Sequence, residues 1–241
     1  MTDSIPTSYG TIVGDHLARI EKHNAEAIDR AASAILTTVR ADGTVYTAGA
    51  GHSLAAVAET FYRAGGLALI RPLYHPDLLP MHGARSSTTA ERRSGLAEEV
   101  LGKVDITGED TLVVFSHSGI NPYPVELAAA GRAAGCPVIA VTSTAAGAAA
   151  PRRSHSTVAE QADVILDTLV PPGDAAYPRE SPVTAALSSI STGFLWNLVL
   201  VRLHDRTETE LPRWRSANVV GGDQANAALF DRQLPRIPEL G

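Results

Sequence analysis

The stretch TLVVFSHSG (residues 111–119) decides the fold of this chain, because it joins a buried strand to an unusually polar turn. A run of Leu, Val and Phe predicts a strand that is covered on both faces. A helical pattern follows at 124–134, and Gly135 ends it. A strand that merely stops needs one turn residue, whereas this strand ends in two serines, a histidine and a glycine. We therefore expect the turn to hold an anion.

The same alternation of strand and helix extends along the chain in both directions. We expect a helix over 11–39, strands within 44–53, 67–73, 137–143 and 163–170, helices over 54–63 and up to about 101, and a long apolar helix over 181–203. Strands of nearly continuous Val, Ile and Leu that alternate with helices predict an α/β fold. We expect one domain over 1–241, with a parallel five-stranded sheet covered on both faces and helical extensions at both ends.

Composition excludes several classes of function. The net charge of −6 argues against a general affinity for nucleic acid or for an anionic membrane. The single cysteine, Cys136, allows no intramolecular disulfide, and the opening MTDSIPTSYG lacks the features of a secretory signal. The segment 181–203 is long enough to span a bilayer, but its scattered polar residues predict a buried helix instead. We expect a cytoplasmic protein.

A second polar turn, GAGHS at 49–53, precedes the predicted helix at 54–63. Glycines let the backbone approach a ligand, and a helix N-terminus favours an anion. A dinucleotide site is a poor match, because Leu54 stands where the third glycine belongs and Arg71-Pro72 supplies no acidic residue for a ribose. Ser53 could instead serve only as an N-cap.

The two turns follow parallel strands, so they should face one crevice at the carboxyl edge of the sheet. Two helix N-termini and three hydroxyls could then surround a dianionic phosphate without a lysine. The alternative is again capping, with Ser118 or Asn121 serving only to start the next helix. Two such junctions in one chain favour the anion site.

These motifs resemble the sugar isomerase (SIS) domain family. GAGHS and FSHSGINPYPVELAAAGRAAGCPVIAVTS at 115–143 carry the resemblance. FYRAGG at 61–66, ARSSTTAER at 84–92 and SANVVGGDQAN at 216–226 resemble a phosphosugar-binding group within it that is related to phosphoheptose isomerases. The resemblance implies a flavodoxin-like three-layer α-β-α sandwich, a sugar phosphate as small-molecule partner, and assembly as a homodimer or homotetramer.

The resemblance also implies which residues bind the substrate. They are Gly51, His52, Ser53, Ser116, His117, Ser118, Gly119 and Asn121. Asn121 departs from the threonine that is usual at its position, and it offers an amide where a hydroxyl is expected. The backbone amides of His117 and Gly119 are expected to add donors for the phosphate.

Aldose–ketose isomerisation of a sugar phosphate needs a group that moves a proton between adjacent carbons. The candidate catalytic residues are Glu59, His82 and Glu91, although each could be an ordinary surface or loop residue. Phosphoheptose isomerases carry a histidine and a glutamate where Glu59 and Arg63 stand here. They also carry a late histidine about where Ser188 or Ser189 falls. These differences put that exact reaction and its metal site in doubt, and we expect neither a metal nor another cofactor.

Three functions remain open at this point. The first is a sugar-phosphate isomerase. The second is a lyase or etherase acting on an amino-sugar phosphate, which would use a similar carboxylate. The third is a sensor that binds a phosphosugar without catalysis.

Overall fold

The computed structural model describes residues 8–208 and 210–241, and its centre is a five-stranded parallel sheet in the order β2-β1-β3-β4-β5. The strands are β1 (Val45–Gly49), β2 (Ile70–Leu73), β3 (Thr111–Phe115), β4 (Val138–Thr142) and β5 (Val164–Asp167). This order is flavodoxin-like, and the strand sequence reverses its direction between β1 and β3. The expected α/β fold with a five-stranded parallel sheet is therefore confirmed.

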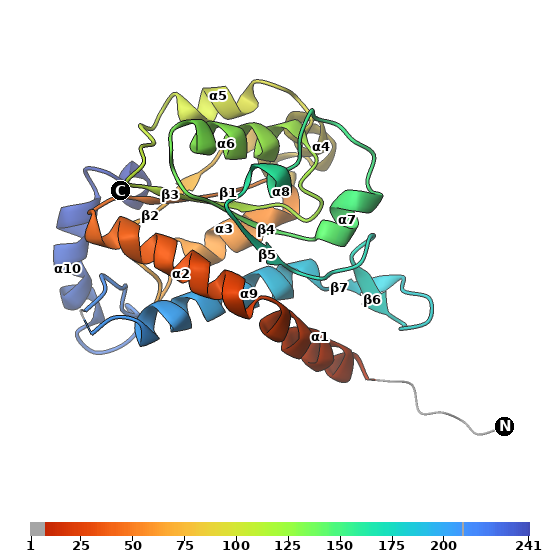
Figure 1. Cartoon of the computed structure of the whole chain (residues 1–241). Coiled ribbons are helices and arrows are strands. Elements are labelled where there is room, and N and C mark those ends of the chain that lie inside the picture. The colour runs from red at the N-terminus through yellow and green to blue at the C-terminus, as the bar shows by residue number, and fades with distance from the viewer. Residues whose placement is uncertain (1–7, 209) are drawn as a thin grey trace.

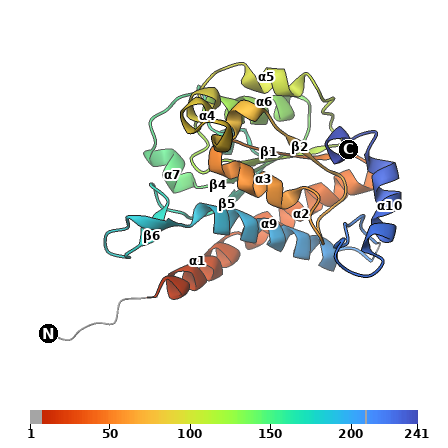
Figure 2. The ribbon, with the colours of Figure 1, turned by 180° about the vertical axis from the view of Figure 1, so that it is seen from behind.

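Helices cover both faces of this sheet (Figures 1 and 2). One face carries α2 (Ala25–Arg40), α3 (Leu54–Thr60) and α9 (Ser188–Asp205), and the other carries α4 (Ala84–Glu91), α5 (Leu96–Leu101), α6 (Pro122–Ala133) and α8 (Val158–Gln161). The short α7 (Thr144–Ala149) follows β4, α10 (Gly222–Gln233) lies beside the β2 edge, and α1 (Tyr9–His23) points away from the sheet. The result is the expected three-layer α-β-α sandwich.

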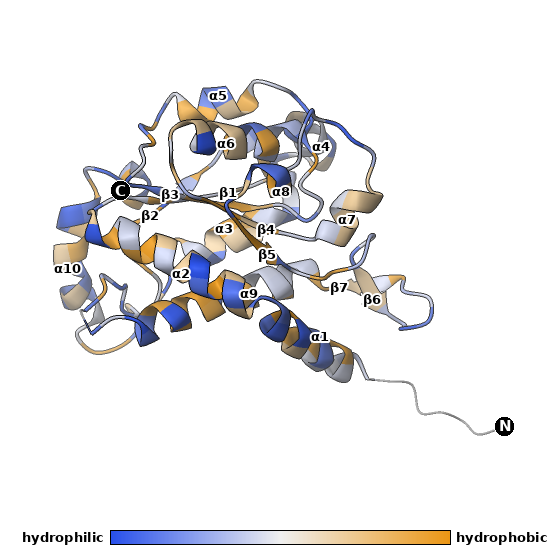
Figure 3. Cartoon of the chain, in the orientation of Figure 1, coloured by the Kyte–Doolittle hydropathy of each residue, from blue (hydrophilic) through white to orange (hydrophobic). Residues whose placement is uncertain are grey.

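The core lies where the helices meet the sheet. Every residue of β1, β3 and β4 is buried, as near-continuous apolar strands require when both faces are covered. Figure 3 shows the apolar colour gathered on the strands. Phe115, the last residue of β3, is fully buried and meets Trp196 of α9 edge-to-face, with 6.5 Å between ring centroids. The carboxyl end of β3 is thereby held by the core.

The helix expected over 11–39 is two helices, which break at Asn24. Asn24 is buried, and its side chain bonds to β5 in both directions. Nδ2 donates to the Asp167 carbonyl at 2.8 Å, and Oδ1 accepts from the Asp167 N–H at 2.7 Å. Asparagine side chains that bond to backbone compete with helix continuation. The tertiary bond thus sets the point where α1 leaves the sandwich.

The apolar stretch 181–203 is only partly helical. Its first part forms β7 (Thr184–Ala186), which pairs antiparallel with β6 (Ala175–Tyr177), and α9 begins at Ser188. One face of α9 is buried, whereas Val201 remains 57% exposed. Among the helices of the described ranges, none has the length and apolar character that crossing a membrane requires.

The polar stretch 74–94, for which no helix was predicted, contains the 3₁₀ turns at Pro76–Leu78 and Pro80–His82 and the helix α4. Four consecutive Ser and Thr residues at 86–89 and the absence of an apolar stripe explain why the sequence pattern did not predict this helix. The buried Ser87 hydroxyl donates to the Leu78 carbonyl at 2.8 Å, which ties α4 to the turn before it. The helix matters because one of its faces borders the candidate site.

Candidate functional site

A cavity of about 400 Å³ lies at the carboxyl edge of the sheet, beside the ends of β1 and β3. This is the topological switch point, where open α/β sheets bind their ligands. Its volume falls within the range of small-molecule sites, about 300–1,000 Å³.

Four segments supply the lining of this cavity. They are the turn after β1 (Ala50, Gly51, His52, Ser53), the turn after β3 (Ser116, His117, Ser118, Asn121), the segment containing α4 (Pro80, Ala84, Ser87, Thr88, Glu91) and the segments leading into and opening α9 (Thr168, Asp174, Ser188, Ser189, Thr192). The two polar turns singled out in the sequence therefore border the same cavity.

The turn after β1 brings the Ser53 hydroxyl to the cavity without using it for capping. Gly51 has φ = +58°, a conformation that glycine adopts freely. Ser53 precedes α3, but its side chain makes no capping hydrogen bond. Within the described part of the chain, the Ser53 hydroxyl has no partner. The explanation of Ser53 as an N-cap is therefore wrong, and its hydroxyl is free for a ligand.

In the turn after β3, some polar groups already have a hydrogen-bond partner within the turn and others do not. The Gly119 N–H donates to the Ser116 hydroxyl oxygen at 3.2 Å, so this amide already has an acceptor. The Ser118 hydroxyl has no hydrogen-bond partner among the residues the structure describes. Asn121 precedes α6, but its side chain does not cap that helix. Ser118 and Asn121 thus offer their side chains to the cavity.

His117, from the same turn, also borders the cavity. Both ring nitrogens are buried, and neither has a hydrogen-bond partner among the described residues. Burial lowers the pKa of His117 from its usual 6.5, against the opposing pull of the Asp174 carboxylate. The ring is therefore neutral at pH 7, and it can both donate and accept a proton.

One face of α4 forms the opposite wall. Ala84, Ser87, Thr88 and Glu91 line the cavity, and their spacing of i, i+3, i+4 and i+7 puts them on one side of a helix. The Glu91 carboxylate has no hydrogen-bond or ion-pair partner among the described residues. It is a carboxylate that a ligand could meet directly.

The segments around the start of α9 supply residues that the sequence analysis did not select. The Asp174 carboxylate accepts from the N–H groups of Leu187 and Ser188, at 3.0 and 2.8 Å, and so caps α9. Thr168 is buried, and its hydroxyl has no partner within the described ranges. These positions lie far from the motifs in sequence, and no local pattern marks them.

Three of the expected site residues are not among those that line the cavity. Glu59 is 41% exposed at its side chain and pairs with Arg63 at 2.9 Å, beside a separate groove. His82 is exposed, and its Nδ1 lies 3.1 Å from the Pro76 carbonyl oxygen. Gly119 has φ = +63°, and a Cβ on it would point at Thr142 and Val158. Of the three carboxylate and imidazole candidates for catalysis, Glu91 alone borders the cavity.

Positive charge is scarce at this site. Among the described residues that line the cavity, none is lysine or arginine. The N-terminus of α6 contributes few donors, because Pro122 and Pro124 lack an N–H. At the start of α9, the N–H groups of Leu187 and Ser188 already bond to Asp174. The helix ends therefore offer an anion less than the sequence led us to expect.

The described residues contain no group of three or more His, Cys, Asp or Glu side chains arranged to hold a metal ion. The side chains that line the cavity offer hydroxyls, an amide, carboxylates and imidazoles.

The fold and the polar turns at its switch point define the class of protein: a flavodoxin-like α/β protein with a polar cavity at the carboxyl edge of its sheet. A family model described as SIS domain matches residues 8–143. A UPF0309 protein of Listeria innocua is 32% identical over 238 residues, which cover 93% of this chain and 94% of that protein. A UPF0309 protein of Brucella canis is 32% identical over 246 residues, which cover all of both chains. The chain belongs to the SIS domain family.

Solved structures agree on the fold. The sugar isomerase domain of the RpiR transcription factor from Sphaerobacter thermophilus matches with a TM-score of 0.53 and 18% identity, over 97% of this chain and 99% of that one. A phosphoheptose isomerase from Neisseria gonorrhoeae matches with a TM-score of 0.50 and 18% identity, over 79% of this chain and 92% of that one. At this identity the likeness establishes the shared fold.

Proposed function

We propose that this protein binds a sugar phosphate in the switch-point cavity and isomerises it between aldose and ketose. The observation that carries the proposal is the pair of unpartnered hydroxyls, Ser53 and Ser118, which two separate turns bring to one cavity that also contains Glu91. Hydroxyl and amide donors suit phosphate oxygens. The protein would act in the cytoplasm and, as the SIS resemblance implies, as a homodimer or homotetramer.

The proposed phosphate contacts are Ser53, Ser116, Ser118 and Asn121. Gly51, His52 and His117 would contact the rest of the sugar, because they line the same cavity beside these groups. The amide of Gly119 bonds to Ser116, so it would reach a phosphate only if that bond were exchanged. The phosphate would thus be held mainly by side chains.

Isomerisation requires one proton to move between carbons and another between oxygens. Glu91 would remove the proton from C2 of the aldose, which leaves an enediolate, and return it to C1 to give the ketose. The proton on the C2 hydroxyl would move to the C1 oxygen of the same enediolate, so that each proton lost at one position is gained at the other.

A lyase or etherase would use Glu91 in the same first step, and a sensor would use only the binding groups. A thermal-shift screen against sugar phosphates and the matching free sugars tests the binding. At a hundred times Kd, a bound ligand should raise Tm by about 5 °C or more. Free sugars should produce no comparable shift, and equal responses to both sets would refute the proposal.

Turnover separates the three functions. Each stabilising sugar phosphate is incubated with the protein, and the mixture is assayed for the isomeric sugar phosphate and for released fragments. An isomeric product supports the isomerase, a fragment with loss of the substituent supports the lyase or etherase, and binding without any product supports the sensor.

A further inference from the structure

The cavity has an excess of negative charge that the residues lining it do not neutralise. Glu91 and Asp174 both border it, and a bound phosphate would add up to two more negative charges. None of the described lining residues is lysine or arginine, the start of α6 lacks the N–H groups of its two prolines, and the Ser188 N–H of α9 already bonds to Asp174. A cation that acts from just outside the lining would compensate for this excess of negative charge.

Arg153 is in the required place. Its guanidinium donates from Nη1 to Oδ1 of Asn121 at 2.9 Å. Asn121 is 8% exposed and lines the cavity, whereas Arg153 lies on the exposed side of it. The guanidinium is therefore separated from the cavity by a single side-chain amide.

This contact fixes the orientation of the amide. A guanidinium carries only donors, so the Asn121 atom that faces it must be the carbonyl oxygen. The nitrogen Nδ2 then lies on the side of the amide away from Arg153, and no described residue accepts from it. Hydrogen bonds in such a chain polarise one another, so a guanidinium on Oδ1 makes Nδ2 a stronger donor.

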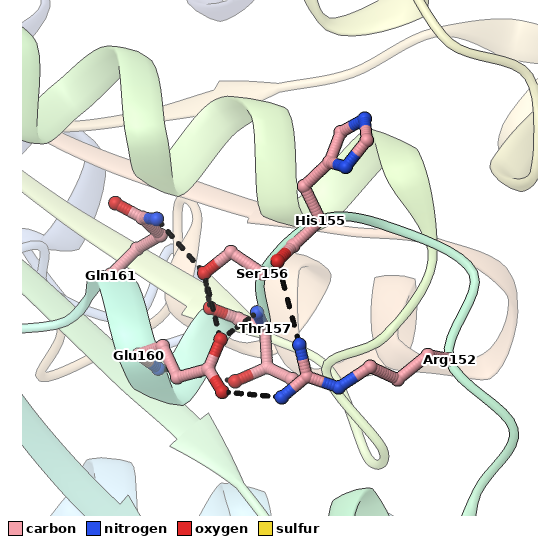
Figure 4. Close-up of polar contacts among 6 residues, drawn as sticks. All are labelled: Arg152, His155, Ser156, Thr157, Glu160 and Gln161. Atoms are coloured by element: carbon pink, nitrogen blue, oxygen red, sulfur yellow. Dashed lines mark hydrogen bonds and ion pairs between the residues drawn. The ribbon is translucent and has the colours of Figure 1, made fainter.

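Hydrogen bonds and an ion pair hold the segment on either side of Arg153 (Figure 4). Before it, Arg152 pairs with Glu160 at 2.9 Å. After it, Glu160 accepts from the Thr157 N–H at 3.0 Å and the Ser156 hydroxyl at 3.0 Å, which completes a capping box for α8. The Val158 N–H donates to the Gly119 carbonyl at 2.8 Å, so a hydrogen bond also joins this segment to the turn after β3.

We propose that Arg153 is a positioning residue for phosphate, which orients and polarises Asn121 so that its Nδ2 donates to the bound oxyanion. The inference rests on the proposed function, since it concerns the same cavity. The ligand is predicted to be a phosphate ester, and Arg153 supplies positive charge without entering the cavity.

Calorimetric titration with glucose 6-phosphate, or with whichever sugar phosphate gives the largest thermal shift, tests this role. Arg153→Ala should raise Kd about tenfold. Arg202→Ala is the matched control, because it removes the same charge from α9, where Arg202 forms an ion pair with Asp29 of α2. It should leave Kd within about twofold of the wild type. In an Asn121→Ala background, Arg153→Ala should have no further effect, since the coupling passes through the Asn121 side chain.

The contact between Arg153 and Asn121 can also be tested by a measurement without ligand. In a ¹H–¹⁵N spectrum, the side-chain NH₂ pair of Asn121 is assigned as the pair that disappears in Asn121→Thr. Its resonances should move in Arg153→Ala and stay in place in Arg202→Ala. Adding the sugar phosphate to the wild type should shift the same pair.

The outcomes separate the two proposals. If the wild type binds the sugar phosphate and Arg153→Ala binds it equally well, the role of Arg153 is wrong while the proposed function stands. If the Asn121 pair does not move in Arg153→Ala, the inferred contact is wrong as well. If no sugar phosphate binds the wild type, both proposals fail.

Discussion

The helices α3 and α4 each carry a glutamate near their C-terminal end, and the two carboxylates have different environments. Glu59 of α3 pairs with Arg63 on the surface at 2.9 Å. Glu91 of α4 borders the switch-point cavity and has no partner among the residues described. Both residues lie close in sequence to a motif that resembles the SIS family, but only one of them can meet a ligand in this cavity.

The difference is one of helical phase. Glu91 lies on the same face as Ala84, Ser87 and Thr88, and that whole face lines the cavity. Glu59 comes six residues after Ser53, which corresponds to roughly 240° around an ideal helix. A residue displaced by that angle faces away from the ligand that Ser53 meets. Distance along the chain from a polar turn is therefore a poor guide to which residue borders the cavity, whereas helical spacing is a good one.

The largest effect should come from placing a negative charge in the cavity. Ser118→Asp should abolish binding of a sugar phosphate, with Kd raised about a thousandfold or more, because like charges brought together cost several kcal/mol. Ser118→Ala should cost less, about tenfold. Calorimetry measures both values. Tight binding by the aspartate variant would mean that the phosphate lies elsewhere.

The next effect distinguishes the two glutamates directly. Glu91→Gln should lower kcat for isomerisation about a hundredfold or more, since it removes the general base but keeps the shape of the side chain. Glu59→Gln serves as the control and should retain most of the wild-type rate. A coupled assay of the isomeric product measures both. The reverse ranking would return the catalytic role to α3.

Lowering the pH should reduce the stability of the fold, because two histidines in different regions have lowered pKa values. Burial lowers the pKa of His117 in the cavity, and burial together with Arg19 lowers the pKa of His16 on α1. Below about pH 6.5 the unfolded chain takes up these protons before the folded protein does, so the free energy of unfolding should fall as the pH falls. Urea denaturation at pH 7 and 5.5 measures the change.

Replacement of either histidine by asparagine should make that pH dependence shallower. Bound sugar phosphate should alter the contribution of His117 and leave that of His16 unchanged, because only His117 borders the cavity. Identical pH slopes in the wild type and in both variants would count against this assignment.

The smallest effect concerns the Glu59–Arg63 pair. Glu59→Ala should lower the free energy of unfolding by about 0.5 kcal/mol or less, because an exposed i, i+4 ion pair contributes little. Ligand affinity should not change. Thermal melting and calorimetry give the two quantities, and a clear loss of affinity would show that α3 takes part in binding.

The sequence was sufficient to predict the parallel sheet and the two polar turns. Val- and Leu-rich strands such as β3 and β4 carry their signal in a few adjacent residues, and so does the junction of each strand with a polar turn. The break at Asn24 and the hairpin β6-β7 were missed, because each depends on partners distant in the chain. Local patterns cannot report such contacts.

The residues of the candidate site also divide into those that the local sequence could identify and those that it could not. Ser53, Ser116 and Ser118 could be selected because they follow strands directly. Thr168 and Asp174 could not, since they reach the cavity only through the packing of β5 and α9. The wall formed by α4 had a usable signal, the polar spacing from Ala84 to Glu91, but it was hidden in a stretch that resembled a loop. Arg153 becomes visible only with its contact to Asn121.

The central claim is that the switch-point cavity holds a phosphate group, and a crystal structure of the protein with a stabilising sugar phosphate tests it most directly. We predict the phosphorus between the Ser53 and Ser118 hydroxyls, with at least one phosphate oxygen within hydrogen-bond distance of each, and the sugar extending toward Glu91. A phosphate bound instead at the groove beside Glu59, Arg63 and Arg213 would contradict the account.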